Sequence, residues 1–103
     1  MAYDREYAKM CVGNGWHGLV DELFDVAEKE DFTVTDVKEK FGTLRIYAVF
    51  LSEKADKLLQ DLERRSHTMC ECCGQPAEQR TKGGWVKTIC IPCEEINRVL
   101  AKA

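Results

Sequence analysis

Two pairs of cysteines constrain the last third of this 103-residue chain more than any other feature. Each pair has the form Cys-x-x-Cys, Cys70 with Cys73 and Cys90 with Cys93, and 16 residues separate the pairs. This spacing is typical of a zinc site made of four thiolates, because a tight turn within each pair lets both sulfurs face one ion. The segment has little apolar material of its own, so we expect one structural zinc ion to organise it.

The first pair can be read in a second register, because Cys72 lies beside Cys73 and could replace it as a ligand. His67 is also close enough in sequence to compete for the metal. We favour Cys73, since a Cys-x-x-Cys pair followed by glycine is the commoner knuckle and Gly74 supplies the permissive backbone that it needs. A disulfide framework is the weaker alternative, because the N-terminal residues do not resemble a signal peptide.

The residues around the cysteines predict a small zinc module over residues 67–103. Two short strands are expected over residues 77–80 and 85–89, on either side of a glycine-containing turn. A helix is expected to start at the second cysteine pair, because apolar residues recur there at helical spacing. Knuckle, hairpin and helix follow one another in the order of a treble-clef zinc finger.

Residues 1–66 predict helices packed against a small antiparallel sheet. Some stretches repeat apolar residues at helical spacing, and others alternate between apolar and polar residues. The predicted elements are a short helix before Gly13, a helix over 17–29, strands over 31–38 and 44–50, and a helix over 53–65 capped by Ser52. A loose hairpin with Gly42 at its turn joins the strands, and Phe50 is expected on the core side of the second strand. The whole chain is therefore predicted to be α+β, with the finger packed on the N-terminal region as one cooperative unit.

The hydrophobic content and the net charge of the chain indicate which classes of function are expected and which are disfavoured. The chain is 45% hydrophobic and 32% charged, with a formal charge of -3, as expected of an ordinary soluble protein. Acidic charge disfavours binding to DNA or RNA, because that affinity depends mostly on neutralising phosphates. We expect a cytoplasmic protein, since no apolar run is long enough to span a membrane.

Cations and aromatic rings gather on the predicted hairpin and beside the finger. The candidate ligand-binding residues are Lys38, Lys40, Arg45, Tyr47, Trp16 and Trp85. Both tryptophans follow a glycine at the start of a predicted element, where we expect partial exposure. Cations beside rings suit a small anionic ligand with a flat ring, such as a nucleotide, and equally an acidic patch on a protein partner. Alternatively, the aromatic residues are core residues that join finger to hairpin.

Nothing in the sequence predicts catalysis. Four cysteines would close the coordination shell of the zinc ion, whereas a catalytic zinc keeps one position open. The chain has neither a glycine-rich phosphate loop nor a metalloprotease helix motif. We therefore expect a non-enzymatic protein.

Several stretches resemble a family of short, poorly characterised proteins of phages and bacterial genomes. They are GWHGLV at 15–20, VKEKFGTLRIY at 37–47, CECCG at 70–74 and GWVKTIC at 84–90. The resemblance covers most of the chain and implies origin and architecture, since the family carries no settled activity. The residue between Cys-Glu and Cys-Gly is here Cys72, which leaves the ligand register open.

These observations lead to one functional hypothesis and two alternatives. The hypothesis is a zinc-binding phage protein that acts in the cytoplasm of a bacterial cell, in an anti-defence or host-takeover role. It would bind and block a host protein, or sequester a nucleotide-type signal. The alternatives are a nucleic-acid-binding zinc-finger regulator and a structural zinc domain within a homo-oligomer.

Overall fold

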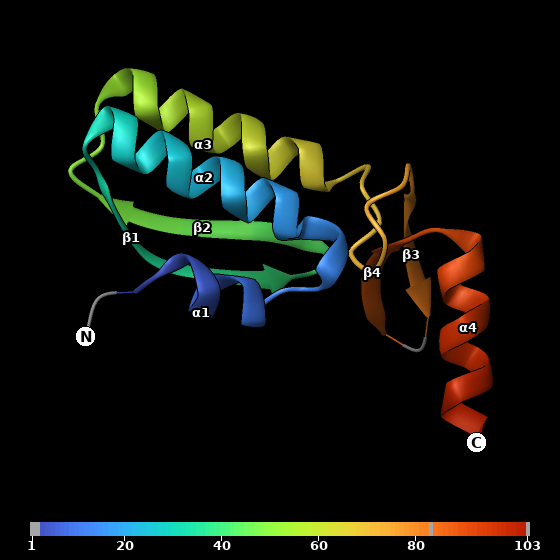
Figure 1. Cartoon of the computed structure of the whole chain (residues 1–103). Coiled ribbons are helices and arrows are strands. Elements are labelled where there is room, and N and C mark those ends of the chain that lie inside the picture. The colour runs from blue at the N-terminus through green and yellow to red at the C-terminus, as the bar shows by residue number, and fades with distance from the viewer. Residues whose placement is uncertain (1–2, 83, 103) are drawn as a thin grey trace.

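The computed structural model describes residues 3–82 and 84–102, which form a helical body with a small finger at its C-terminal end (Figure 1). In the described part, four α-helices accompany two antiparallel sheets of two strands each, so the predicted α+β fold is confirmed. The elements are α1 (Arg5–Met10), a 3-10 turn η1 (Asn14–Trp16), α2 (His17–Glu30), β1 (Thr33–Lys40), β2 (Thr43–Val49), α3 (Glu53–Ser66), β3 (Glu78–Lys82), β4 (Trp85–Ile89) and α4 (Ile91–Lys102).

The body is a layer of helices on one face of the β1–β2 sheet. Helices α2 and α3 lie side by side above the sheet, and α1 lies below α2 next to β1 (Figure 1). Apolar side chains from these helices and from both strands are buried between the helices and the sheet. The largest of them are Trp16, Leu19, Leu23, Leu44, Val20 and Val37. The predicted apolar stripe of α2 therefore faces the core.

Side-chain hydroxyls form hydrogen bonds with backbone groups on both outer edges of this two-stranded sheet. On the β2 edge, the Ser66 hydroxyl accepts a hydrogen bond from the Leu44 amide (2.9 Å). On the β1 edge, the Tyr3 hydroxyl accepts from the Val37 amide (2.8 Å) and donates to the Val37 carbonyl (3.2 Å). Because an open strand edge is a template for pairing with another chain, these contacts protect the hairpin against strand addition at the sealed groups.

The hairpin turn is tighter than the loose connection predicted from sequence. Lys40 pairs with Thr43, so the loop consists of Phe41 and Gly42 alone. Both residues have positive φ angles, 54° and 77°, as a type I′ turn requires. Left-handed backbone costs a non-glycine residue roughly 1–2 kcal/mol, and at this position asparagine or glycine is usual.

The prediction that Phe50 faces the core is wrong. Strand β2 ends at Val49, and Phe50 adopts a φ of 65° with 82% of its surface exposed. The left-handed residue redirects the chain toward α3, so strand alternation stops before Phe50 and Leu51 packs against the core instead. The predicted helix cap is confirmed, since the Ser52 hydroxyl accepts from the Ala55 amide (3.0 Å).

The finger consists of a short loop, the β3–β4 hairpin and α4. Helix α4 starts at Ile91, within the second cysteine pair, close to the predicted start. It lies at the far side of the finger from the body (Figure 1). Its apolar side chains are largely uncovered, with Ile91 60%, Ile96 58% and Val99 66% exposed.

Candidate metal centre and adjoining groove

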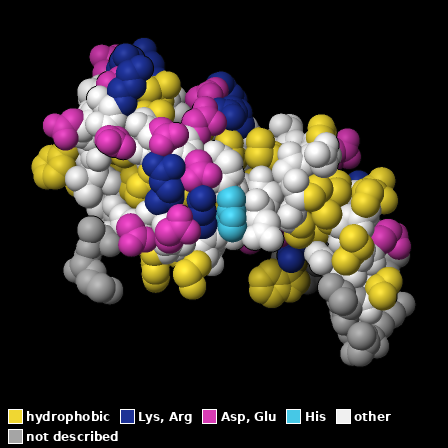
Figure 2. Space-filling model, viewed as in Figure 1, with side chains coloured by type: hydrophobic (Ala, Val, Ile, Leu, Met, Phe, Trp, Pro, Cys, Tyr) yellow, Lys and Arg dark blue, Asp and Glu magenta, His cyan; other side chains and the backbone are white. Residues whose placement is uncertain are grey.

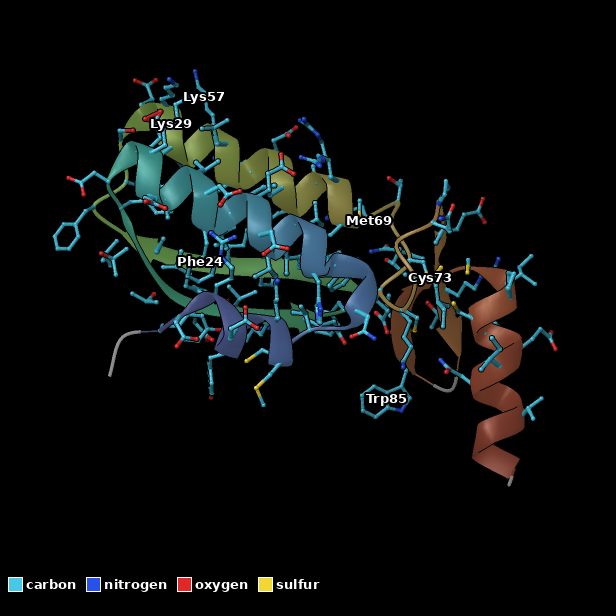
Figure 3. The ribbon with its side chains drawn as sticks, viewed as in Figure 1. Phe24, Lys29, Lys57, Met69, Cys73 and Trp85 are labelled. Atoms are coloured by element: carbon cyan, nitrogen blue, oxygen red, sulfur yellow. The ribbon has the colours of Figure 1, made fainter. Side chains whose placement is uncertain are left out.

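Four cysteines meet where the finger joins the body. The sulfur atoms of Cys70, Cys73, Cys90 and Cys93 all lie within 4.8 Å of one another, and those of Cys73 and Cys90 are 3.6 Å apart. Four thiolates around zinc at about 2.3 Å would have sulfurs about 3.8 Å apart, so the cluster has nearly the size of a tetrahedral site. Figure 3 shows Cys73 between the body and α4.

Local structure brings these sulfurs together. The first pair lies in a tight turn, in which the Gly74 amide donates to the Cys70 carbonyl (2.9 Å) and Gly74 has a φ of 82°. Cys90 directly follows β4, and Cys93 lies in the first turn of α4. The alternative ligand Cys72 is not in the cluster, because its sulfur points to the Asn97 amide nitrogen at 3.9 Å.

The thiols of the cluster differ in acidity. Burial alone would raise the pKa of Cys70, but backbone amides of Cys90, Cys73 and Cys72 outweigh it and bring that pKa to about 6. The Cys93 thiol donates hydrogen bonds to the sulfurs of Cys90 and Cys73, which stabilises its protonated form and raises its pKa. The cluster therefore holds one thiolate readily and resists further negative charge. A soft divalent cation would remove that resistance, so this sulfur set fits zinc.

The knuckle between Cys70 and Gly74 rests directly on the body. The Gly15 amide donates to the Glu71 carbonyl (2.9 Å), and the Trp16 indole donates to the Met69 carbonyl (2.9 Å). Trp16 is completely buried, so the expectation that it is partly exposed and contacts a ligand is wrong. Its ring fills the junction between η1 and the start of the finger, which is the core role that the sequence left open.

The candidate cations and rings occupy two separate surfaces. Lys38 and Arg45 are cross-strand partners on the sheet face opposite the buried residues, and the Lys38 ammonium lies 5.2 Å from the centre of the Tyr47 ring. Asp36 partly neutralises this surface, with a carboxylate oxygen 3.6 Å from Lys38. We call this surface, made of Lys38, Arg45 and Tyr47, the open sheet face.

Lys40 and Trp85 lie in a groove instead. This groove, of about 550 Å³, is lined by residues of the β1–β2 hairpin tip and of β4 with the turn before it. It is lined by Glu39, Lys40, Phe41, Gly84, Trp85, Val86 and Lys87. We call it the hairpin groove. Phe41 and Lys87 were not among the predicted site residues, although a phenylalanine in a two-residue turn was a signal that could have pointed to Phe41.

Most of the acidic residues of the chain lie on the helices. Asp21 pairs with both Arg5 (3.2 Å) and Lys9 (2.8 Å), and Glu22 pairs with Arg65 (2.8 Å). Figure 2 shows acidic and basic side chains interleaved over the helical layer, with hydrophobic side chains gathered on the finger. Much of the negative charge is thus neutralised locally on the helices, whereas at the groove Glu39 and Glu71 stand beside the two lysines.

Comparison of the chain with protein-family models, with curated proteins and with solved structures finds no match. Among the described residues, no helix has the length and apolar character needed to cross a lipid bilayer.

Proposed function

We propose that this chain is a non-enzymatic zinc-binding protein in which one structural zinc ion is held by Cys70, Cys73, Cys90 and Cys93. The observation that supports this proposal is the convergence of four sulfurs to within 4.8 Å from two separate parts of the chain. Four thiolates would leave zinc no open position for a substrate or an activated water. The metal would act on the fold, by fixing the knuckle, the end of β4 and the start of α4 together.

If the proposed ligand set holds, substitution of Cys73 should remove the bound metal, and substitution of the adjacent Cys72 should not. Cys73→Ser should release the metal and destabilise the finger, because it removes one of four thiolates. Cys72→Ser is the matched control, since its sulfur lies outside the cluster and the substitution should leave metal content unchanged. Equal metal content in both variants, measured by elemental analysis after gel filtration, would refute this ligand set.

The function that we propose for the folded protein is binding. It would act in the cytoplasm of a phage-infected bacterium and there block a host protein or sequester a nucleotide-type signal. Two surfaces support a binding role, the open sheet face and the hairpin groove, because each sets cations beside exposed rings. Such surfaces recognise anionic groups attached to flat or apolar ones.

Capture from bacterial lysate tests this binding role. The double variant Lys38→Glu and Arg45→Glu should lose the captured partner, since it reverses the charge of the open sheet face. The control is Lys29→Glu with Lys57→Glu, which changes the net charge equally at exposed residues of the helical layer (Figure 3). Loss of the same partner by both double variants would show that only overall charge matters and would contradict the proposal.

The uncovered apolar side chains of α4 favour a second function, a structural zinc domain in a homo-oligomer. Ile96 and Val99 lie one helical turn apart and are both more than half exposed. If they form the contact between copies, Ile96→Glu should convert an oligomer into a monomer in light-scattering measurements. A wild-type protein that is already monomeric at high concentration would rule this second function out.

A further inference from the structure

The hairpin groove brings together aromatic side chains from the tips of two hairpins that are far apart in sequence. Phe41 is 63% and Trp85 is 75% exposed, and both line the groove together with Lys40 and Lys87. We propose that this groove binds a nucleoside phosphate, with the base stacked on these rings and the phosphate held by the two lysines. The inference rests on the proposed binding role and deepens it by naming the ligand class and the site.

Phe41 has an unusual backbone conformation for a bulky residue, with a φ of 54°. A bulky side chain in a left-handed conformation is strained, and here the ring is also left mostly in water. Neither the turn nor the core requires a phenylalanine at this position, since the type I′ geometry favours asparagine. Strained residues that serve no packing purpose concentrate at functional sites. Phe50 shares the left-handed backbone and the exposure, so it is the position of Phe41 in the lining of the groove that makes it the candidate for contact with a ligand.

The groove is also built on fixed walls. The Thr88 hydroxyl donates a buried hydrogen bond of 2.6 Å to the Gly42 carbonyl, which joins the hairpin tip to β4. A Cβ atom on Gly42 would meet the backbone of Lys87 and Thr88 at 3.1 Å, so the two segments are in close contact. Since β4 continues directly into Cys90, the metal centre would hold the same wall in place.

A buried carboxylate orients one of the two lysines. The Glu71 side chain lies 3.7 Å from the Lys87 ammonium, and its second oxygen is buried without a hydrogen-bond partner in the described structure. Lys87 itself remains about half exposed at the groove. Lys87 and Lys40 line the same groove, so the proposed phosphate would lie between the two lysines.

Size and polarity favour a nucleotide over other anions. A volume of about 550 Å³ lies within the usual range for small-molecule sites. Two lysines alone would suit any phosphate, but two exposed rings add a preference for a flat, stacking group. Glu39 also lines the groove and offers a carboxylate that could accept a hydrogen bond from a base amino group or a ribose hydroxyl. An acidic peptide would use the lysines but leave the stacking surfaces without a matching ring.

Binding of nucleoside mono-, di- and triphosphates to the zinc-loaded protein, measured by calorimetry, tests the inference. At least one of them should bind, and its free nucleoside and inorganic phosphate or triphosphate should each bind far more weakly. Trp85 fluorescence should be quenched by the bound base, whereas the Trp85→Phe variant, which retains only buried Trp16, should show no quenching. No binding by any of these nucleotides would overturn the proposal, as would equal binding of inorganic triphosphate or preferred binding of an acidic peptide.

Phe41→Asn separates the ligand-binding role of this side chain from a role in stability. The variant should melt at a higher temperature than the wild type, because asparagine suits the turn, and should bind the nucleotide at least about fivefold more weakly. Phe50→Asn is the matched control, since Phe50 is also left-handed and exposed but does not line the groove. Equal nucleotide affinity in both variants would overturn the proposal. Lysate capture that depends on Lys38 and Arg45, without nucleotide binding, would overturn this inference alone and leave the proposed binding role standing.

Discussion

The contact between body and finger predicts an unusually damaging substitution at Gly15. A Cβ atom added there would overlap the Cys70 carbonyl oxygen, and it would lie 2.5 Å from the Gly74 nitrogen and 2.8 Å from the Cys73 nitrogen. All three atoms belong to the backbone of the metal knuckle, so no side-chain rotation can relieve the overlap. Gly15→Ala must therefore push the knuckle away from the body.

The loss of stability in Gly15→Ala can be worked out from the contacts that movement of the knuckle would break. Overpacking in a tight site typically costs about 1–3 kcal/mol, and loss of the Gly15 to Glu71 hydrogen bond adds about 1 kcal/mol. We expect the free energy of unfolding to fall by about 2–4 kcal/mol. For a chain of this size that corresponds to a fall in melting temperature of at least about 8 °C. Zinc affinity should fall as well, because the knuckle carries two of the four ligands.

Gly18→Ala is the matched control for this prediction. Nothing lies within 4 Å of a Cβ atom at Gly18, which is in the first turn of α2. Alanine in a helix is more favourable than glycine, so this variant should gain about 0.4–1 kcal/mol. Thermal unfolding of both variants, with and without a chelator, checks the argument. A Gly15→Ala protein that melts within about 2 °C of the wild type would refute the proposed seating of the knuckle on the body.

Three further predictions test other contacts. Ser66→Ala should lower the free energy of unfolding by about 1–3 kcal/mol in urea titrations, because it leaves the Leu44 amide buried without its acceptor. Burial raises the pKa of Glu71 and the Lys87 ammonium opposes that rise, so ionisation of Glu71 destabilises the fold as pH increases. Lys87→Met should therefore lower the free energy of unfolding by about 1 kcal/mol near pH 7 and by less near pH 4. An equal loss at both pH values would contradict the pairing of Lys87 with Glu71. In excess chelator, stability should rise between about pH 6 and pH 8.5, because amide hydrogen bonds lower the pKa of Cys70 below that of an unfolded thiol.

Much of the architecture could be predicted from the sequence because the signals are local. Helix α2 has one apolar stripe, Ser52 is a side-chain cap, and the spacing of the cysteines encodes a cluster. Phe50 was misassigned for an equally local reason. Alternation predicts which face a residue occupies only while the strand continues, and a single left-handed residue ended it.

The hairpin groove could not be predicted, because it depends on contacts between distant segments. Trp16 and Trp85 have the same immediate context, a preceding glycine and the start of an element, yet one is fully buried and the other is 75% exposed. Only the position of η1 against the knuckle explains the burial of Trp16. In the same way, the hairpin groove depends on the Thr88 to Gly42 contact, which no sequence pattern encodes.

Native mass spectrometry of the purified protein, compared with denaturing spectra of the same sample, tests the central claim most directly. We predict one zinc ion per chain in the wild type and in Cys72→Ser, and none in Cys73→Ser or Cys90→Ser. A wild-type protein without zinc, or a Cys90→Ser protein that keeps its full metal content, would contradict the four-thiolate site on which the finger and the groove wall depend.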